Sequence, residues 1–108
     1  MRDRLIAARA RIAEPENWLQ GHFARTATGK AVLPADPKAT CFCLVGTLRA
    51  DDTPDDPAFS SLVAFVTKII LHRFKGRFIN APAFNDHKDT THAGVLRVLD
   101  IAIERAPC

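Results

Sequence analysis

The chain has 108 residues, of which 47% are apolar and 25% are charged, and 15 Lys and Arg against 12 Asp and Glu give a formal net charge of +3. This length suits one globular domain, residues 1–108, and the apolar fraction is too high for an intrinsically disordered chain. The longest apolar runs, 41–45 and 62–66, are far shorter than the roughly 20 residues of a membrane-spanning helix. The N-terminus also lacks the apolar run of a signal peptide. We therefore expect a cytoplasmic protein that makes no contact with a membrane.

The three cysteines, Cys41, Cys43 and Cys108, predict no disulfide framework, because thiols stay reduced in the cytoplasm. No CxxC, HExxH or Cys/His quartet with zinc spacing occurs, and the four histidines lie in different segments. The sequence therefore predicts neither a metal site nor a cofactor.

Residues 2–13 are predicted to form an amphipathic helix that ends before Pro15. Its inward stripe is expected to consist of Leu5, Ile6, Ile12 and Ala13. Arg9 falls within that stripe. We expect its aliphatic stem to lie along the edge of the core; the alternative is that its guanidinium meets a buried carboxylate.

The helical period is lost after Trp18. The sequence Ala27-Thr28-Gly29-Lys30 is typical of a turn between two short extended segments. We therefore predict a small hairpin, with strands at 22–26 and 31–33, that packs against helices because a two-stranded hairpin is marginal by itself.

Asp36-Pro37 is typical of a helix start, with Asp as N-cap and Pro at the first helical position. The helix predicted from there to about Ala50 has apolar side chains on both sides: Ala39, Phe42, Cys43, Gly46 and Ala50 on one, and Cys41, Leu44, Val45 and Leu48 on the other. It should therefore be the buried central helix. Because glycine is unfavourable inside a helix, Gly46 predicts the close approach of another backbone.

An acidic loop at 51–57 precedes a helix predicted to begin at Asp56-Pro57 and to end near Gly76, and 78–84 is expected to be a connector. The inward stripe of that helix is Phe59, Leu62, Val63, Val66, Ile69, Ile70 and Phe74. The last helix should run from Thr91 to about Ala106, with Val95, Leu96, Leu99, Ala102 and Ile103 inward. The fold class predicted is mainly α (α+β), with four helices and a small hairpin between the first and the second.

Short motifs occur in a fixed order along almost the whole chain: Trp18-x-Gln20-Gly21, Asp36-Pro37-x-Ala39, Phe42-Cys43-x-x-Gly46, Phe84-Asn85-Asp86 and Leu99-Asp100. In this order and spacing the chain resembles an uncharacterised bacterial and phage family of domains of unknown function. The resemblance implies no activity, cofactor or partner. Similar sequences often have an acidic residue three positions after the threonine that caps the last helix, which completes a capping box, whereas this chain has Gly94.

Trp18, Gln20, Asn85 and Asp86 are the candidate binding residues. Each has a polar group where an apolar core would suffice. They could form a small cleft with Trp18 as its floor and an amide and a carboxylate at its rim. Alternatively, Asn85 and Asp86 bond to backbone groups of a turn, and Trp18 fills core volume while its indole N–H reaches a carbonyl.

Cys43, Asp86 and either His87 or His92 are the residue types of a Cys-dependent hydrolase, in which a base activates the thiol and a third group orients the base. A nucleophilic cysteine is expected to be exposed in electropositive surroundings. Cys43 lies instead on an apolar stripe, which favours a buried and inert thiol.

The segment 68–88 is basic, and its candidate patch consists of Lys68, Arg73, Lys75 and Arg77. With Phe74 and Phe78 interleaved, it could bind a nucleic-acid strand through phosphate contacts and base stacking. The alternative is a solvated helix end, where cations are favoured by the helix dipole.

The sequence favours a small module without catalytic activity that binds a protein, either a second copy of itself or another chain, or inhibits one, as accessory proteins of phages and mobile elements do. One alternative is a ligand-binding domain or hydrolase that uses the Trp18, Gln20, Asn85 and Asp86 cleft. A second alternative is nucleic-acid binding through residues 68–88.

Overall fold

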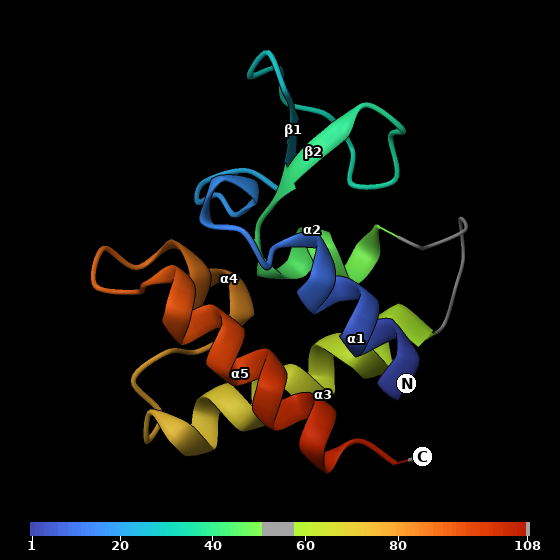
Figure 1. The fold of residues 1–108 in the computed structure, drawn as a ribbon. Coiled ribbons are helices and arrows are strands. Elements are labelled where there is room, and N and C mark those ends of the chain that lie inside the picture. The colour runs from blue at the N-terminus through green and yellow to red at the C-terminus, as the bar shows by residue number, and fades with distance from the viewer. Residues whose placement is uncertain (51–57, 108) are drawn as a thin grey trace.

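The computed structural model describes residues 1–50 and 58–107. Within them the chain forms α1 (Arg2–Arg11), the 3-10 helix η1 (Pro15–Asn17), β1 (Ala24–Thr26), β2 (Ala39–Phe42), α2 (Leu44–Arg49), α3 (Ala58–Arg73), α4 (Ala81–Asp86) and α5 (His92–Arg105). This confirms the predicted class, a mainly helical α+β domain with a two-stranded antiparallel hairpin between α1 and α2. Figure 1 shows the hairpin at one end of the helical body, with α5 crossing α3 at the other.

The first and last helices pack against each other. The buried face of α1 consists of Leu5 and Ala8 and continues in Ile12, whereas Ile6 and Ala13 are exposed, so their inward placement was wrong. Residues three and four apart share one side of a helix, and an immediate neighbour points about 100° away.

Arg9 pairs with a carboxylate of α5. Its Nε donates to Asp100 Oδ1 and its Nη2 lies 3.4 Å from Asp100 Oδ2. The guanidinium therefore meets a carboxylate, as in the alternative expectation. The partner is a half-exposed carboxylate rather than the buried one of the alternative, so the cation is neutralised at the rim of the α1–α5 contact.

The turn at 27–30 forms, but the strand that pairs with β1 comes from elsewhere. Ala24 lies opposite Phe42, and Thr26 opposite Ala39. The segment predicted as the partner, 31–33, contributes an isolated bridge between Ala31 and Arg25 on the other side of β1. The loop from 27 to 38 therefore leaves β1 at the turn, runs back along it and reaches β2.

The helix predicted from Asp36-Pro37 was wrong at its start. Asp36 Oδ1 accepts from the backbone N–H of Lys38 at 2.8 Å. This hydrogen bond closes a turn, and Asp is as common in such turns as at helix caps. Residues 39–42 form β2, and the N-cap is Cys43, seven residues later. The helix that remains, α2, is buried from Leu44 to Leu48, so the predicted central burial is confirmed for this short helix.

Gly46 is approached by another backbone, as the sequence predicted. A Cβ at this position would overlap the carbonyl group of Phe23, with the carbonyl carbon at 2.9 Å. The carbonyl oxygen of Phe23 accepts from Cys43 N at 3.2 Å. A glycine in α2 therefore lets the segment before β1 lie directly on the helix.

The remaining helices follow the sequence closely, with one addition. Buried side chains of α3 are Leu62, Val66, Ile69 and Ile70; the predicted acidic loop and cap at 51–57 lie outside the described residues. Within 78–84, expected to be a connector, α4 begins after Asn80, whose side chain accepts from Ala83 N at 2.8 Å. Thr91 caps α5, as predicted. The inward face of α5 includes Val98 and Ile101, while Leu96 and Ile103 are only half-buried.

No helix in the described ranges, 1–50 and 58–107, is long and apolar enough to cross a bilayer.

Candidate functional site

Asn85, near the end of α4, is the centre of the polar network at the junction of the hairpin and the helices. The residue is 1% exposed. Its Oδ1 accepts from Trp18 Nε1 at 2.7 Å and from Leu44 N at 3.0 Å, and its Nδ2 donates to the carbonyl of Leu19 at 3.1 Å and to Asp86 Oδ1 at 2.9 Å. An amide side chain has two donors and two acceptor positions. All four are used, and they join the 18–19 segment and the start of α2 to α4.

Gln20 and Asp86 attach the next part of the chain to the same helix. Gln20 Nε2 donates to the backbone carbonyls of Asn85 at 2.8 Å and His87 at 3.0 Å. In return, Gly21 N donates to Asp86 Oδ1 at 3.0 Å. The positive φ of Gly21, 87°, suits glycine and turns the backbone at this point.

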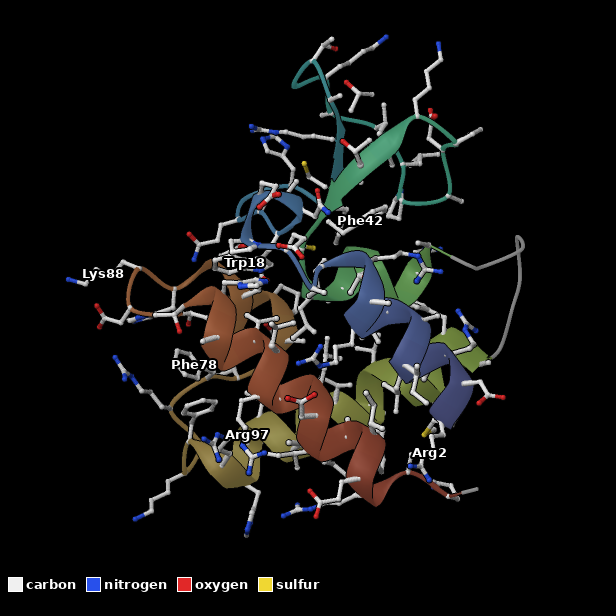
Figure 2. All side chains as sticks on the ribbon, in the orientation of Figure 1. Arg2, Trp18, Phe42, Phe78, Lys88 and Arg97 are labelled. Carbon is white, nitrogen blue, oxygen red and sulfur yellow. The ribbon has the colours of Figure 1, made fainter. Side chains whose placement is uncertain are left out.

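The structure thus brings together the four candidate binding residues of the sequence. Each of them is hydrogen-bonded to another member of the group, which accounts for its polar side chain. Trp18 is half-buried, its ring lies 6.0 Å from that of His92, and Figure 2 shows it where the N-terminal segment meets the helices. Its indole N–H is occupied by Asn85. The network accounts for the amide of Gln20 and one oxygen of Asp86 in the same way, and it serves to fix segments far apart in the sequence.

A hollow of about 550 Å³ lies next to this network. We call it the hairpin pocket; its lining includes Phe23, Val32, Leu33, Cys43, Pro82 and Asp86. Leu33 is 78% exposed and Phe23 56%. Asn85 also lines the pocket, whereas Trp18 and Gln20 are not part of the lining, so the cleft expected with Trp18 as its floor does not form as predicted.

Sequence reasoning missed the apolar side of this pocket. Phe23 and Leu33 lie in segments without helical or alternating periodicity, so neither was assigned to a face. Pro82 lies in the segment 78–84, for which the sequence predicts a connector, whereas the structure places it in α4. The only signal for them in the sequence is the presence of large apolar residues beside turn residues.

Cys43 lies at the N-terminus of α2 and is 7% exposed. Its Sγ accepts from Gly46 N at 3.2 Å, as an N-cap does. Burial raises the pKa of this thiol, and the nearby carboxylate of Asp86 acts in the same direction, against the lowering by backbone N–H groups of Gly46 and Val45. The thiol is therefore neutral at pH 7, which opposes nucleophilic attack because the thiolate is the reactive form.

Neither histidine suggested as a base is hydrogen-bonded to Cys43. His92 donates from Nε2 to the carbonyl of Ile12 at 2.6 Å. His87 accepts at Nδ1 from Asp89 N at 3.1 Å and packs against Phe78. His22 is the histidine that lines the hairpin pocket with Cys43, and the described residues include no hydrogen bond between the two.

The basic patch lies at the end of α3 and in the turn that follows. Lys68, Arg73, Lys75 and Arg77 are all exposed, but Arg77 pairs with Asp89 at 3.2 Å. Phe78 is 5% exposed and packs edge-on against Phe84. Phe74 is half-buried in the same cluster. The aromatic rings are thus mainly used in the core, which removes much of the expected base stacking.

Metal ligands do not cluster in the part of the chain that the structure describes: no group of three or more His, Cys, Asp or Glu side chains there could hold an ion.

A protein-family model described as a family of unknown function, DUF6197, matches residues 1–105. No curated protein and no solved structure matches the chain.

Proposed function

The chain belongs to DUF6197, a family of unknown function, and we propose that it is a protein-binding module whose hairpin pocket takes up a segment of a partner protein. The observation that carries the proposal is the pairing of a hollow with exposed apolar side chains at its edge. Leu33 and Phe23 are 78% and 56% exposed and both line it. Single exposed apolar residues are common, but apolar residues gathered at a pocket are typical of sites that receive an anchor side chain.

The apolar lining of the hairpin pocket indicates a large apolar side chain as the anchor. Val32 and Pro82 extend the apolar surface of Phe23 and Leu33. Burial of a Leu or Phe side chain contributes roughly 1.5–3 kcal/mol, which is enough for one anchor to dominate a small interface.

Asp86 gives the pocket a negative charge next to this apolar surface. Its Oδ1 accepts from Gly21 N and Asn85 Nδ2, whereas Oδ2 accepts no hydrogen bond from any described residue. The carboxylate is exposed and can therefore take a charge-assisted hydrogen bond from outside. The partner segment that fits this chemistry has an apolar side chain close to a Lys or Arg.

Selection from a random peptide library on the purified protein tests this proposal. The expected result is a set of peptides in which a large apolar residue lies near a basic one. Leu33→Asp should weaken their binding by about tenfold or more, because a charge replaces apolar contact at the pocket. Asp86→Asn should weaken it about tenfold while the Oδ1 acceptor is kept.

Ile79→Asp is the matched control, because Ile79 is also 78% exposed and does not line the pocket. It should leave peptide binding unchanged. The proposal is wrong if the selected peptides share no basic residue or if Leu33→Asp and Ile79→Asp have the same effect. Sedimentation of the protein alone identifies a second copy as the partner: self-association that Leu33→Asp abolishes would place that copy on the pocket.

The same proposal includes an accessory or inhibitory role in the cytoplasm, of the kind that small proteins of phages and mobile elements have. The small size of the chain supports it. Genes encoding relatives should then lie beside phage or defence genes. Neighbourhoods of ordinary metabolic genes would contradict this part and leave the peptide-binding part intact.

Catalysis by Cys43 is the rival function, and one observation favours it: Cys43 and His22 line the same pocket. The raised pKa of the thiol opposes it. Alkylation of Cys43 in the native protein distinguishes the two functions, because only an exposed thiolate reacts fast.

A further inference from the structure

A second hollow, of about 300 Å³, lies where α3 and α5 cross. We call it the α3–α5 hollow; it is lined by Ile69, His72, Arg73, Ile101 and Arg105. Figure 1 shows α3 and the end of α5 at the opposite end of the molecule from the hairpin. The hollow is thus separate from the hairpin pocket.

Three of the five lining side chains are basic, and none of them has a carboxylate within 4.0 Å among the described residues. Elsewhere in this part of the chain, Arg9 pairs with Asp100 and Arg77 with Asp89. The contact recorded for Arg73 is with the ring of Phe74, at 5.8 Å. His72, Arg73 and Arg105 therefore bring donors to one place without a carboxylate of the described residues beside them.

The helix dipole accounts for part of this arrangement. Cations are favoured at helix C-termini, and Arg73 and Arg105 are the last residues of α3 and α5. The dipole favours a cation at each end separately. It does not require the two ends to meet at one hollow with an apolar floor, which Ile69 and Ile101 provide at 5% and 7% exposure.

We infer that the α3–α5 hollow binds an oxyanion of the phosphate class. Guanidinium groups offer several N–H donors in a plane and match the oxygens of a phosphate in pairs. All three basic side chains of the hollow are exposed, so a phosphate can reach them from solvent. The inference rests on residues remote from the hairpin pocket and is independent of the proposed protein binding.

A phosphate group can come from a small phosphorylated molecule or from a nucleic-acid strand. Lys68 precedes His72 by four residues, so the two lie on the same side of α3, and Lys75 follows Arg73 in the next turn. These exposed lysines could meet further phosphates of a strand. Inorganic phosphate and a ten-residue oligothymidine therefore serve as the two arms of the test.

The experiment is a titration of the backbone amide NMR signals of the full chain with sodium phosphate, against sodium chloride at the same ionic strength. Phosphate should cause saturable shifts at 69–73 and 101–105, and chloride should not. Arg73→Gln and Arg105→Gln should each weaken binding by about tenfold, since each removes a charge-assisted contact. Lys88→Gln is the matched control: it also removes one positive charge, at an exposed residue after α4 that does not line the hollow.

Equal shifts with chloride, or equal weakening by Lys88→Gln, would overturn the inference. If the oligothymidine binds more tightly than phosphate, shifts the signals of Lys68 and Lys75 and loses affinity steeply with salt, the phosphate belongs to a strand. If it binds no more tightly, the site takes a small phosphorylated molecule. Leu33→Asp should leave phosphate binding unchanged, so this inference and the proposed function can fail separately.

Discussion

At the scale of single residues, Asn85 is the polar side chain on which the contact between the hairpin end and the helices depends. It is buried, and its four hydrogen bonds reach two separate parts of the chain, residues 18–19 and the start of α2, and the neighbouring Asp86. A buried polar group that is fully hydrogen-bonded adds little to the free energy of unfolding. Its removal is costly, because its former partners stay buried without a hydrogen bond. The importance of Asn85 therefore lies in the groups that it satisfies.

Asn85→Ala should destabilise the protein by about 3 kcal/mol or more, because each buried group left without a partner costs roughly 1–3 kcal/mol. The groups affected are the Trp18 indole N–H, the Leu44 N–H and the Leu19 carbonyl. Urea unfolding measures the change. Asn80→Ala is the control, since it removes an exposed helix cap and should cost about 1 kcal/mol. Equal losses in the two variants would show that the network is not a main support of the fold.

Cys43 should react slowly with iodoacetamide in the native protein at pH 7, at least about a hundredfold more slowly than after unfolding, since burial keeps the thiol neutral. Half-buried Cys41 is an internal reference, and peptide mass mapping reads both. Fast native labelling of Cys43 would favour the hydrolase rival.

The same raised pKa predicts a pH dependence of stability. The pKa of Cys43 lies above its ordinary value of 9.0 in the folded state. The thiol therefore contributes fully to the free energy of unfolding below pH 9.0, and this contribution is lost as the pH rises through the folded pKa. Cys43→Ser keeps a capping side chain and removes the titration, so wild type should lose stability relative to this variant above about pH 9. Parallel curves would contradict the burial of the thiol.

At the scale of elements, the sequence predicts an element correctly where the residues of that element alone determine its structure. The 3.6-residue spacing of Leu62, Val66, Ile69 and Ile70 suffices to predict α3, and Thr91 with the apolar face behind it suffices for α5. In each case the signal and the structure lie in the same fifteen or so residues.

The segment 36–43 shows why the rest could not be predicted. Asp followed by Pro starts turns as well as helices, and Ala39 to Phe42 becomes a strand because β1 lies alongside and offers hydrogen-bonding partners. Whether these residues form a helix or a strand is thus decided by Ala24 to Thr26, fifteen residues away. Tertiary pairing outweighs the weak local propensity.

The candidate site was predictable in its polar part and not in its apolar part. Trp18, Gln20, Asn85 and Asp86 could be singled out because polar groups in an apolar context need partners, and they prove to be partners of one another. The hairpin pocket is a space left between elements, bordered by the loop before β2 and by Pro82. No local pattern encodes such a space.

At the scale of the molecule, the hairpin end and the helical body are held together by few but specific contacts. The radius of gyration is 12.8 Å, close to the value of about 13 Å for a single domain of this length. The Asn85 network and the backbone contact between Phe23 and Gly46 cross the boundary between the two parts. Unfolding of either part should therefore break these contacts and destabilise the other part.

This coupling predicts that the chain unfolds as one unit. Trp18 is the only tryptophan and reports on the junction by its fluorescence, whereas far-UV circular dichroism reports mainly on the helices. The two signals should change at the same urea concentration and with the same m-value, about 1–3 kcal/mol per molar urea. A fluorescence change at lower urea than the loss of helical signal would mean that the hairpin end opens first. The hairpin pocket would then be formed by a part of the molecule that can detach from α4, and its shape would depend on whether a partner is bound.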